Sequence, residues 1–375
     1  MYKSKVAILT LPLHTNFGGN LQAYALSKTL QNLGFDVEII NLVSDRYNNK
    51  SYYIKLLKKL IKQYVFFKDM PVLLTPKEYL SIGKNHIDFI KYHMKLTSPI
   101  YDKNNITSIF RSNNYSAVIV GSDQVWRKAY TPNIYTFFLD FIKDKKIKKI
   151  AYAASFGLDE WQYDKNETDK LRVLAKDFNY ISVREDSALK LCQDYLGVNP
   201  DHVLDPTLLL SKKDYLNLCK DIKSENKGKV FNYILDTTPE KTKIVNKIAS
   251  KLNKEVFGIT LNKNKETRLV DNNDSYIIPP VEQWLKSFDD ADFVITDSFH
   301  GMVFSIIFNK PFYVLVNEKR GASRFYSLLK QLNLEDRILN KDNFLDFKEI
   351  NFSIINGKIN HQVKDIKGLL KVLLG

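Results

Sequence analysis

Short apolar runs alternate with helical patterns along the chain. Four runs in the first half are typical of strands buried on both faces: 5–11, 116–123, 149–157 and 180–186. Residues 36–42 alternate apolar and polar positions as a further strand, and 21–34 carries Leu26, Leu30 and Leu33 at helical spacing. Strands that alternate with helices predict an α/β fold with a mostly parallel sheet.

A second series of strands and helices begins after the Asp205-Pro206 step. Its strands are expected at 230–235, 256–261, 292–296 and 312–316. We therefore expect two doubly wound domains that face each other across a cleft, with ligands at the carboxyl ends of the strands. The expected limits are 1–204 for the first domain, 205–350 for the second, and 351–375 for a C-terminal helix that packs back on the body.

The segment near 51–110 does not fit the sheet, and we interpret it as an insert in the first domain. Its beginning, 51–68, is basic and amphipathic. The apolar face carries Leu56, Leu57, Leu60, Ile61 and Tyr64, and the lysines elsewhere are Lys55, Lys58, Lys59 and Lys62. This face can pack on the first domain, as in most amphipathic helices, or it can hold the protein on a membrane surface. The sequence leaves both interpretations open.

Composition adds a preference for anionic partners. The 375 residues are 44% apolar and 26% charged, which is typical of a globular protein, and the formal charge of +14 favours phosphorylated metabolites, nucleic acid or acidic lipid. No nucleic-acid-binding motif accompanies this charge, so we expect no nucleic acid partner. Cys192 and Cys219 stand in no metal-ligand spacing. Free thiols, no recognisable signal peptide and no long apolar run together predict a cytoplasmic location.

The stretch 14–26 forms the turn between the first predicted strand and its helix. Gly18 and Gly19 allow a ligand to approach the backbone closely, and the helix N-terminus offers free amides to an anion. The alternative is a tight turn in which Asn16 and Asn20 act as caps.

The stretch 118–127 ends a buried strand with small and polar residues, followed by Trp126. Asp123 is either the cap of the next helix or a group that binds a hydroxyl or accepts its proton. In a parallel sheet Asp123 and Gln124 face the cleft.

Arginines follow two other predicted strands. The guanidinium of Arg184 suits a carboxylate or phosphate, although it can equally pair with the acidic residues beside it. Residues 317–325 place Arg320 and Arg324 in a loop that can close on the same cleft.

A histidine stands between an apolar strand and an apolar helix in 296–301 (TDSFHG). A lone histidine on such a helix is often a core or capping residue. His300, however, lies at the helix start, beside Gly301, which lets a ligand approach the backbone. A helix N-terminus disfavours the imidazolium, so an acid here needs an anionic neighbour such as Asp297 or a bound phosphate.

Six stretches, in this order and at these spacings, resemble the polysaccharide pyruvyl transferase family. They are NFGGNLQAYAL (16–26), VGSDQVW (120–126), AYAASFG (151–157), SVRED (182–186), LDPTLLL (204–210) and TDSFHG (296–301). The resemblance implies two Rossmann-like domains, similar to the glycosyltransferase-B arrangement. It also implies transfer of the enolpyruvyl unit of phosphoenolpyruvate to two hydroxyls of one sugar, in capsule, exopolysaccharide or cell-wall glycan synthesis. No metal and no cofactor are implied.

On this chain the resemblance makes His300 the general acid that protonates the methylene carbon of phosphoenolpyruvate, and Arg184 a ligand of that substrate. Many family members carry a second arginine where Ser298 stands, so we expect Arg324 or Arg320 to supply the missing charge. The candidates for binding phosphoenolpyruvate are Arg184, Arg324, Arg320, Ser298, Gly301, Gly18 and Gly19.

The resemblance also suggests a galactose-type acceptor on a polyprenyl diphosphate at the inner face of the plasma membrane, which 51–68 would contact. Asp123 is the candidate base. The candidate ligands of the sugar hydroxyls are Asn16, Asn20 and Gln124. Trp126 either stacks on the sugar ring or lies in the core.

Two other functions remain open. A nucleotide-sugar glycosyltransferase of the same architecture would hold a diphosphate at 297–301, but no clear acidic ribose ligand follows in 302–316. A non-catalytic relative would keep the fold without using His300.

Overall fold

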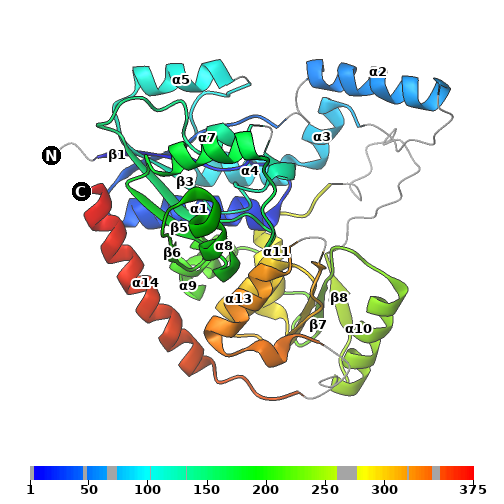
Figure 1. The fold of residues 1–375 in the computed structure, drawn as a ribbon. Coiled ribbons are helices and arrows are strands. Elements are labelled where there is room, and N and C mark those ends of the chain that lie inside the picture. Colours follow the sequence, from blue (N-terminus) through cyan, green and yellow to red (C-terminus); the bar gives the residue numbers. More distant parts are fainter. Residues whose placement is uncertain are drawn as a thin grey trace.

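The computed structural model describes residues 4–44, 49–65, 74–101, 103–131, 133–259, 277–318, 321–339 and 347–375. This part of the chain forms two β-sheets flanked by helices (Figure 1). The six-stranded sheet has the order β2-β1-β3-β4-β5-β6, and the four-stranded sheet has the order β10-β9-β7-β8. All neighbouring strands run parallel. The predicted α/β class is confirmed.

The first sheet contains the strands that the apolar runs predict. They are β1 (Lys5–Leu9), β2 (Asp36–Ile39), β3 (Tyr115–Gly121), β4 (Lys148–Ala154), β5 (Tyr180–Val183) and β6 (Asp201–His202). The sequence does not predict β6, because its two residues are polar. The helices of this sheet are α1 (Phe17–Asn32), α5 (Lys103–Ser112), α6 (Ile134–Phe137), α7 (Lys165–Ala175) and α8 (Asp186–Leu191), and α8 continues into the π-helical turn η3 (Cys192–Leu196). Residues 6–9 and 117–120 are buried on both faces, which explains their uninterrupted apolar character.

The second sheet follows a short connection made of the 3₁₀ helix η4 (Pro206–Leu209) and α9 (Lys212–Leu218). Its strands are β7 (Val230–Tyr233), β8 (Val256–Gly258), β9 (Phe293–Thr296) and β10 (Phe312–Val314). Its helices are α10 (Pro239–Leu252), α11 (Val281–Asp290), α12 (Phe299–Ile307), α13 (Ser323–Leu332) and the 3₁₀ helix η7 (Glu335–Arg337). The Asp205-Pro206 step therefore lies in the connection between the sheets. The last two residues of the strand expected at 256–261 lie outside the described residues.

The two sheets share one apolar core. Leu21 of α1, Trp284 of α11 and Phe304 of α12 belong to the same cluster of buried side chains. The long helix α14 (Phe352–Leu374) lies within the expected 351–375 and contributes to this core. Figure 1 shows that it runs from the second sheet back to the first, where Lys148 Nζ donates a hydrogen bond to the Leu373 carbonyl at 2.8 Å.

Three helices form the insert after β2: α2 (Asn49–Val65), α3 (Pro76–Ile82) and α4 (Lys84–His93). Helix α4 lies against both α1 and α11. Asn85 Nδ2 donates to the Ile278 carbonyl at 2.8 Å, and the buried Nδ1 of His86 lies 3.0 Å from Asn20 Nδ2. Burial lowers the pKa of His86 to about 4, so this imidazole is neutral. Helix α4 thus braces α1, which forms one wall of the site described next.

Candidate active site

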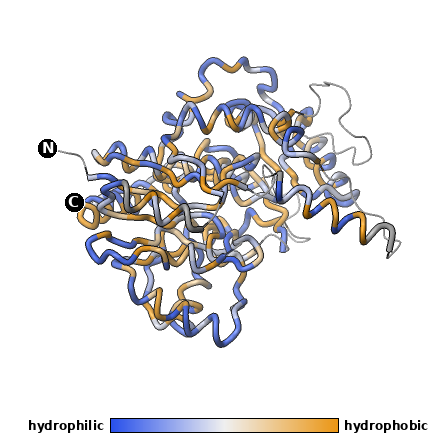
Figure 2. The backbone as a smooth tube through the Cα atoms, turned by 90° about the horizontal axis from the view of Figure 1, so that it is seen from above, coloured by the Kyte–Doolittle hydropathy of each residue, from blue (hydrophilic) through white to orange (hydrophobic). Residues whose placement is uncertain are grey.

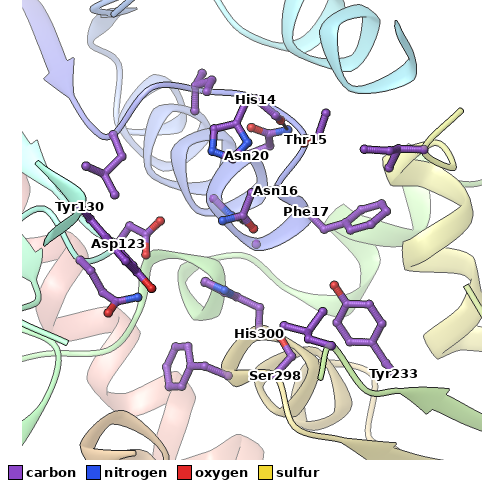
Figure 3. A pocket seen from close by; sticks show the side chains of 18 of the residues that line it. His14, Thr15, Asn16, Phe17, Asn20, Asp123, Tyr130, Tyr233, Ser298 and His300 are labelled. Atoms are coloured by element: carbon purple, nitrogen blue, oxygen red, sulfur yellow. Dashed lines mark hydrogen bonds between the residues drawn. The ribbon is translucent and has the colours of Figure 1, made fainter. Parts of the chain in front are cut away.

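A cavity of about 1130 Å³ lies between the carboxyl ends of the two sheets (Figure 3). Residues that follow four different strands line it: Thr10, Asp123, Leu235 and Asp297. Open parallel sheets bind their ligands at this place. In Figure 3, His300 and Asn16 approach each other from opposite walls, and Asp123 and Tyr130 lie together to one side.

His300 stands in the first turn of α12. Ser298 caps this helix, because its hydroxyl accepts a hydrogen bond from the Gly301 N–H at 3.3 Å. The His300 side chain is 10% exposed and lines the cavity. Among the described residues, its Nε2 has no hydrogen-bond partner. This nitrogen is buried, so it does not face open solvent.

The other side of the histidine ring lies against the N-terminus of α1. A Cβ atom on Gly18 would come within 2.0 Å of His300 Nδ1, so only glycine fits there. Asn16 caps α1 by accepting a hydrogen bond from the Gly19 N–H at 3.1 Å. The predicted cap role of Asn16 is confirmed, whereas Gly18, Gly19 and Asn20 lie inside the helix, so the expected turn at the glycines and the cap role of Asn20 are wrong. Two helix N-termini, of α1 and α12, therefore meet at one imidazole.

Asp205 is the acidic neighbour of His300, and the sequence did not mark it as a site residue. Its Oδ2 lies 3.7 Å from His300 Nε2 and 2.8 Å from Arg184 Nη1. Its Oδ1 accepts hydrogen bonds from the N–H and the hydroxyl of Thr207, at 2.9 and 2.7 Å. Burial favours a higher pKa for Asp205, but His300 and Arg184 outweigh burial and hold that pKa well below its usual range. The carboxylate is therefore ionised.

Asp297, the neighbour suggested by the sequence, is engaged elsewhere. Its Oδ1 accepts a hydrogen bond from the Leu235 N–H at 2.6 Å. Its Oδ2 accepts from the Asp236 N–H at 3.1 Å and from Lys241 Nζ at 2.6 Å. These contacts tie the end of β7 to the end of β9. The expectation that Asp297 pairs with His300 is corrected: Asp205 fills that place.

Two buried guanidinium groups lie over the ring of Phe299. The Cζ atoms of Arg184 and Arg324 are 4.9 and 5.0 Å from its centroid. Burial and the neighbouring charge of Arg184 lower the pKa of Arg324 to about 10. Arg324 lines the cavity, whereas the side chain of Arg184 is only 1% exposed, with its Nη2 3.9 Å from Asp123 Oδ1. The structure thus brings these two arginines together, and Arg320 lies outside the described residues.

Asp123 follows a sharp bend at the end of β3. The φ angles of Ser122 and Asp123 are 51° and 59°, in the left-handed region. The Asp123 N–H and the Ser122 hydroxyl both donate to Gln22 Oε1, which stabilises the bend. The next helical turn is η2 (Lys128–Tyr130), and Arg127 precedes it. The interpretation of Asp123 as a helix cap is therefore wrong, and its carboxylate lines the cavity.

The predicted sugar ligands differ in their availability. Asn16, Asn20 and Gln124 all line the cavity. Asn20, however, is 1% exposed, and its Nδ2 already donates to the His14 carbonyl at 2.6 Å. Gln124 Oε1 accepts a hydrogen bond from Arg127 Nη1 at 2.6 Å. Asn20 therefore holds the wall of the cavity together.

Two predicted site residues serve packing instead. Trp126 is fully buried, stacks on Phe138 and donates from Nε1 to the Phe137 carbonyl at 3.1 Å. It therefore belongs to the core, which corrects the sugar-stacking interpretation. A Cβ atom on Gly301 would come within 2.2 Å of Thr296 Oγ1. This glycine lets α12 pack on β9, which corrects the expectation that it admits a ligand.

Several cavity residues carry no signal in the sequence. Tyr130 and Tyr233 line the cavity but lie in a 3₁₀ turn and at the end of a short strand. His14 lines it from the loop after β1. Asp205, beside His300, stands in LDPTLLL (204–210), one of the stretches that carry the family resemblance. Because the two residues are far apart in sequence, their contact could not be predicted.

Over the described ranges, no three His, Cys, Asp or Glu side chains lie close enough together to hold a metal ion. Among the same described residues, no helix combines the length and hydrophobicity needed to cross a bilayer.

A model of the polysaccharide pyruvyl transferase family matches residues 16–319. The chain belongs to this family. The matched region begins at the cap of α1 and includes Asp123, Arg184, Asp205 and His300, so it covers the elements around the cavity. A comparison with curated proteins finds no match.

Solved structures with little sequence identity share the fold. The UDP-GlcNAc 2-epimerase of Methanocaldococcus jannaschii is 13% identical with a TM-score of 0.53, and the match covers 98% of this chain and 99% of that one. A putative UDP-N-acetylglucosamine 2-epimerase of Listeria monocytogenes is 13% identical with a TM-score of 0.50, covering 98% and 97%. The expected fold of two Rossmann-like domains, similar to the glycosyltransferase-B arrangement, is confirmed.

Proposed function

We propose that this family member transfers the enolpyruvyl unit of phosphoenolpyruvate to two hydroxyls of one sugar, in capsule, exopolysaccharide or cell-wall glycan synthesis. The contact between His300 and Asp205, 3.7 Å apart at the cavity wall, is the observation that carries the proposal. The ionised carboxylate of Asp205 lies beside the imidazole and would orient it. His300 is then a positioned acid, which carbon protonation requires.

In the proposed reaction, His300 gives its proton to the methylene carbon of phosphoenolpyruvate, which becomes a methyl group. The adjacent carbon becomes electrophilic, and one sugar hydroxyl adds to it while Asp123 accepts the hydroxyl proton. The second hydroxyl then displaces phosphate and closes the ketal. The two sugar hydroxyls release two protons. One returns to His300, and the other leaves on phosphate, so the enzyme returns to its starting state.

The charge of phosphoenolpyruvate needs cationic ligands near His300. Arg324 is the proposed direct ligand, because it lines the cavity. Arg184 lies over the same Phe299 ring and is the proposed second ligand, although it is buried against Asp205. Arg324 or Arg320 would then supply the charge that Ser298 lacks. Arg324→Ala and Arg320→Ala test this. The variant that lacks the ligand should raise the KM for phosphoenolpyruvate at least about tenfold. If neither variant changes the KM, neither arginine supplies the charge missing at Ser298.

We further propose that the acceptor is a galactose-type sugar on a polyprenyl diphosphate, used at the inner face of the plasma membrane. Asn16 and Gln124 are the proposed ligands of its hydroxyls, because both line the cavity. The cavity volume of about 1130 Å³ supports an acceptor larger than one free sugar.

Two parallel incubations test the reaction. The protein receives a galactoside together with either phosphoenolpyruvate or a nucleotide sugar, and the release of phosphate or nucleotide is followed with time. We expect phosphate release and a new methyl singlet of the ketal in the proton NMR spectrum. Nucleotide release instead would make the protein a glycosyltransferase. Binding of phosphoenolpyruvate without any turnover would indicate a non-catalytic relative.

A further inference from the structure

Helix α2 carries an apolar surface that the rest of the described chain leaves uncovered. Its exposed large side chains are Tyr53 (66%), Ile54 (48%), Leu57 (61%), Leu60 (41%) and Ile61 (45%). Their spacing of i, i+1, i+4, i+7 and i+8 places them on one side of the helix. We call these five side chains the α2 stripe. Figure 2 shows the helix at an edge of the molecule, with apolar and polar segments alternating along it.

The sequence left two uses for this helix, packing on the first domain or contact with a membrane. The side chains that are partly covered are Ser51, Tyr52, Leu56 and Lys59, which lie outside the α2 stripe. Five large apolar side chains together on a surface mark an interaction site. The α2 stripe therefore points away from the protein, and packing does not account for it.

The charges around the α2 stripe indicate what covers it. The sequence of α2 contains five lysines and no acidic residue. Lys55 and Lys58 are exposed, and helical spacing puts Lys58 directly beside the stripe. A helix with an apolar side next to a basic side lies in the interface of an anionic bilayer, with its lysines among the headgroups. If a second copy of this protein covered the α2 stripe, its five α2 lysines would lie near the five of the first copy. Repulsion between these like charges opposes such a dimer.

The position of α2 connects this surface to the cavity. Val43 and Ser44 line the cavity, and α2 begins at Asn49. Five residues of chain span at most about 18 Å. The first turn of α2 therefore lies within about 18 Å of the cavity wall.

We propose that the α2 stripe and its lysines dock this protein on an anionic lipid bilayer, so that the cavity receives its acceptor from the membrane surface. The docking itself is independent of the reaction, whereas the membrane-borne acceptor rests on the proposed function.

Flotation of the full chain with lipid vesicles tests the docking. Phosphatidylcholine vesicles with and without phosphatidylglycerol are the probes. We expect the protein to float with the anionic vesicles only, and to be released as salt rises. The double variant Leu57→Glu, Ile61→Glu and the triple variant Lys55→Glu, Lys58→Glu, Lys59→Glu should each reduce the bound fraction about tenfold or more.

Val173→Glu is the matched control, because Val173 is 71% exposed on α7, outside the α2 stripe. It should float like the wild type. The inference is overturned if the wild type stays unbound with anionic vesicles, or if the double variant floats equally well. It is also overturned if light scattering without lipid finds a wild-type dimer that the double variant cannot form.

A second measurement separates this inference from the proposed function. Phosphate release is compared for a soluble galactoside and for a galactosyl lipid held in anionic vesicles. The double variant should keep the rate on the soluble sugar and lose about tenfold on the vesicle-borne one. If neither acceptor reacts with the wild type while flotation persists, the proposed function fails and the docking stands. Equal rates of wild type and variant on the vesicle-borne acceptor would contradict the link between docking and acceptor.

Discussion

Asp205 and Asp297 are both buried carboxylates near the first turn of α12, with 2% and 0% of their surface exposed. Asp297 is only three residues from His300 in sequence, yet both of its oxygens bind the end of β7 and Lys241. Asp205 comes from the connection between the two sheets, and its Oδ2 faces His300. Closeness in sequence therefore does not identify the partner of the histidine.

The difference follows from the directions in which the two side chains leave the backbone. Asp297 follows β9, and its carboxylate accepts hydrogen bonds from the amides that follow the neighbouring strand β7. Asp205 precedes η4, where Thr207 fixes one oxygen and leaves the other to Arg184 and His300. One carboxylate thus holds two strand ends together, and the other brings the charges of both domains to one point.

Replacing His300 removes the side chain that distinguishes the two carboxylates, because Asp205 contacts it and Asp297 does not. His300→Gln keeps a polar side chain of similar length but carries no transferable proton. We expect phosphate release from phosphoenolpyruvate to fall about 1000-fold, with little change in Tm. The readout is kcat in the phosphate-release assay. Activity within about tenfold of the wild type would remove His300 from the chemistry and make the Asp205 contact a structural one.

Gly18→Ala tests whether the position of His300 matters as much as its charge partner. The added Cβ would come within 2.0 Å of His300 Nδ1, so the ring must move. A displacement of about 1 Å at a catalytic group is expected to lower kcat about 100-fold.

Gly357→Ala is the control, because a Cβ there meets no atom within 4 Å and the residue lies inside α14. It should leave kcat unchanged and raise stability by about 1 kcal/mol. If Gly18→Ala retained full activity, the contact between α1 and the histidine would have no role in catalysis.

Asp205→Asn keeps the shape of the side chain and removes its charge. We expect kcat to fall about 30-fold and the free energy of unfolding to fall about 3 kcal/mol, because Arg184 remains buried without its carboxylate. The folded-state pKa of Asp205 lies below its unfolded value of about 4, so its ionised form stabilises the fold above that pH. The difference in the free energy of unfolding between the wild type and Asp205→Asn should be largest at pH 7 and should decrease as pH falls below about 4. Urea titrations at several pH values measure it, and a difference that does not depend on pH would contradict this account.

The apolar runs predict most of the fold because central parallel strands are buried on both faces. Strands β1, β3, β4 and β5 fall where 5–11, 116–123, 149–157 and 180–186 place them. Helix α1 begins earlier than predicted. Gly18 and Gly19 suggest a loop between strand and helix, but both lie in the first turn of the helix. Glycine there serves the close approach of His300, which no local pattern reveals.

Site residues can be predicted from sequence where a residue type that follows a strand has few structural roles other than binding or catalysis. His300, Asp123 and Arg324 reach the cavity as the strand order suggests. Trp126 does not, because an aromatic ring near a strand end fits the core as well as a ligand. Asp205 was missed because its contact with His300 spans 95 residues of chain, from the connection between the two sheets to the start of α12.

The smallest expected effect on activity comes from Asp297→Asn. The asparagine can still accept a hydrogen bond from one of the amides of Leu235 and Asp236, but it loses the charge opposite Lys241. We expect a stability loss of about 1–2 kcal/mol and less than about a threefold change in kcat per folded molecule. Kinetics and urea titration on the same preparation separate the two effects. A loss of kcat as large as that of Asp205→Asn would mean that both carboxylates support His300, and the distinction between them would disappear.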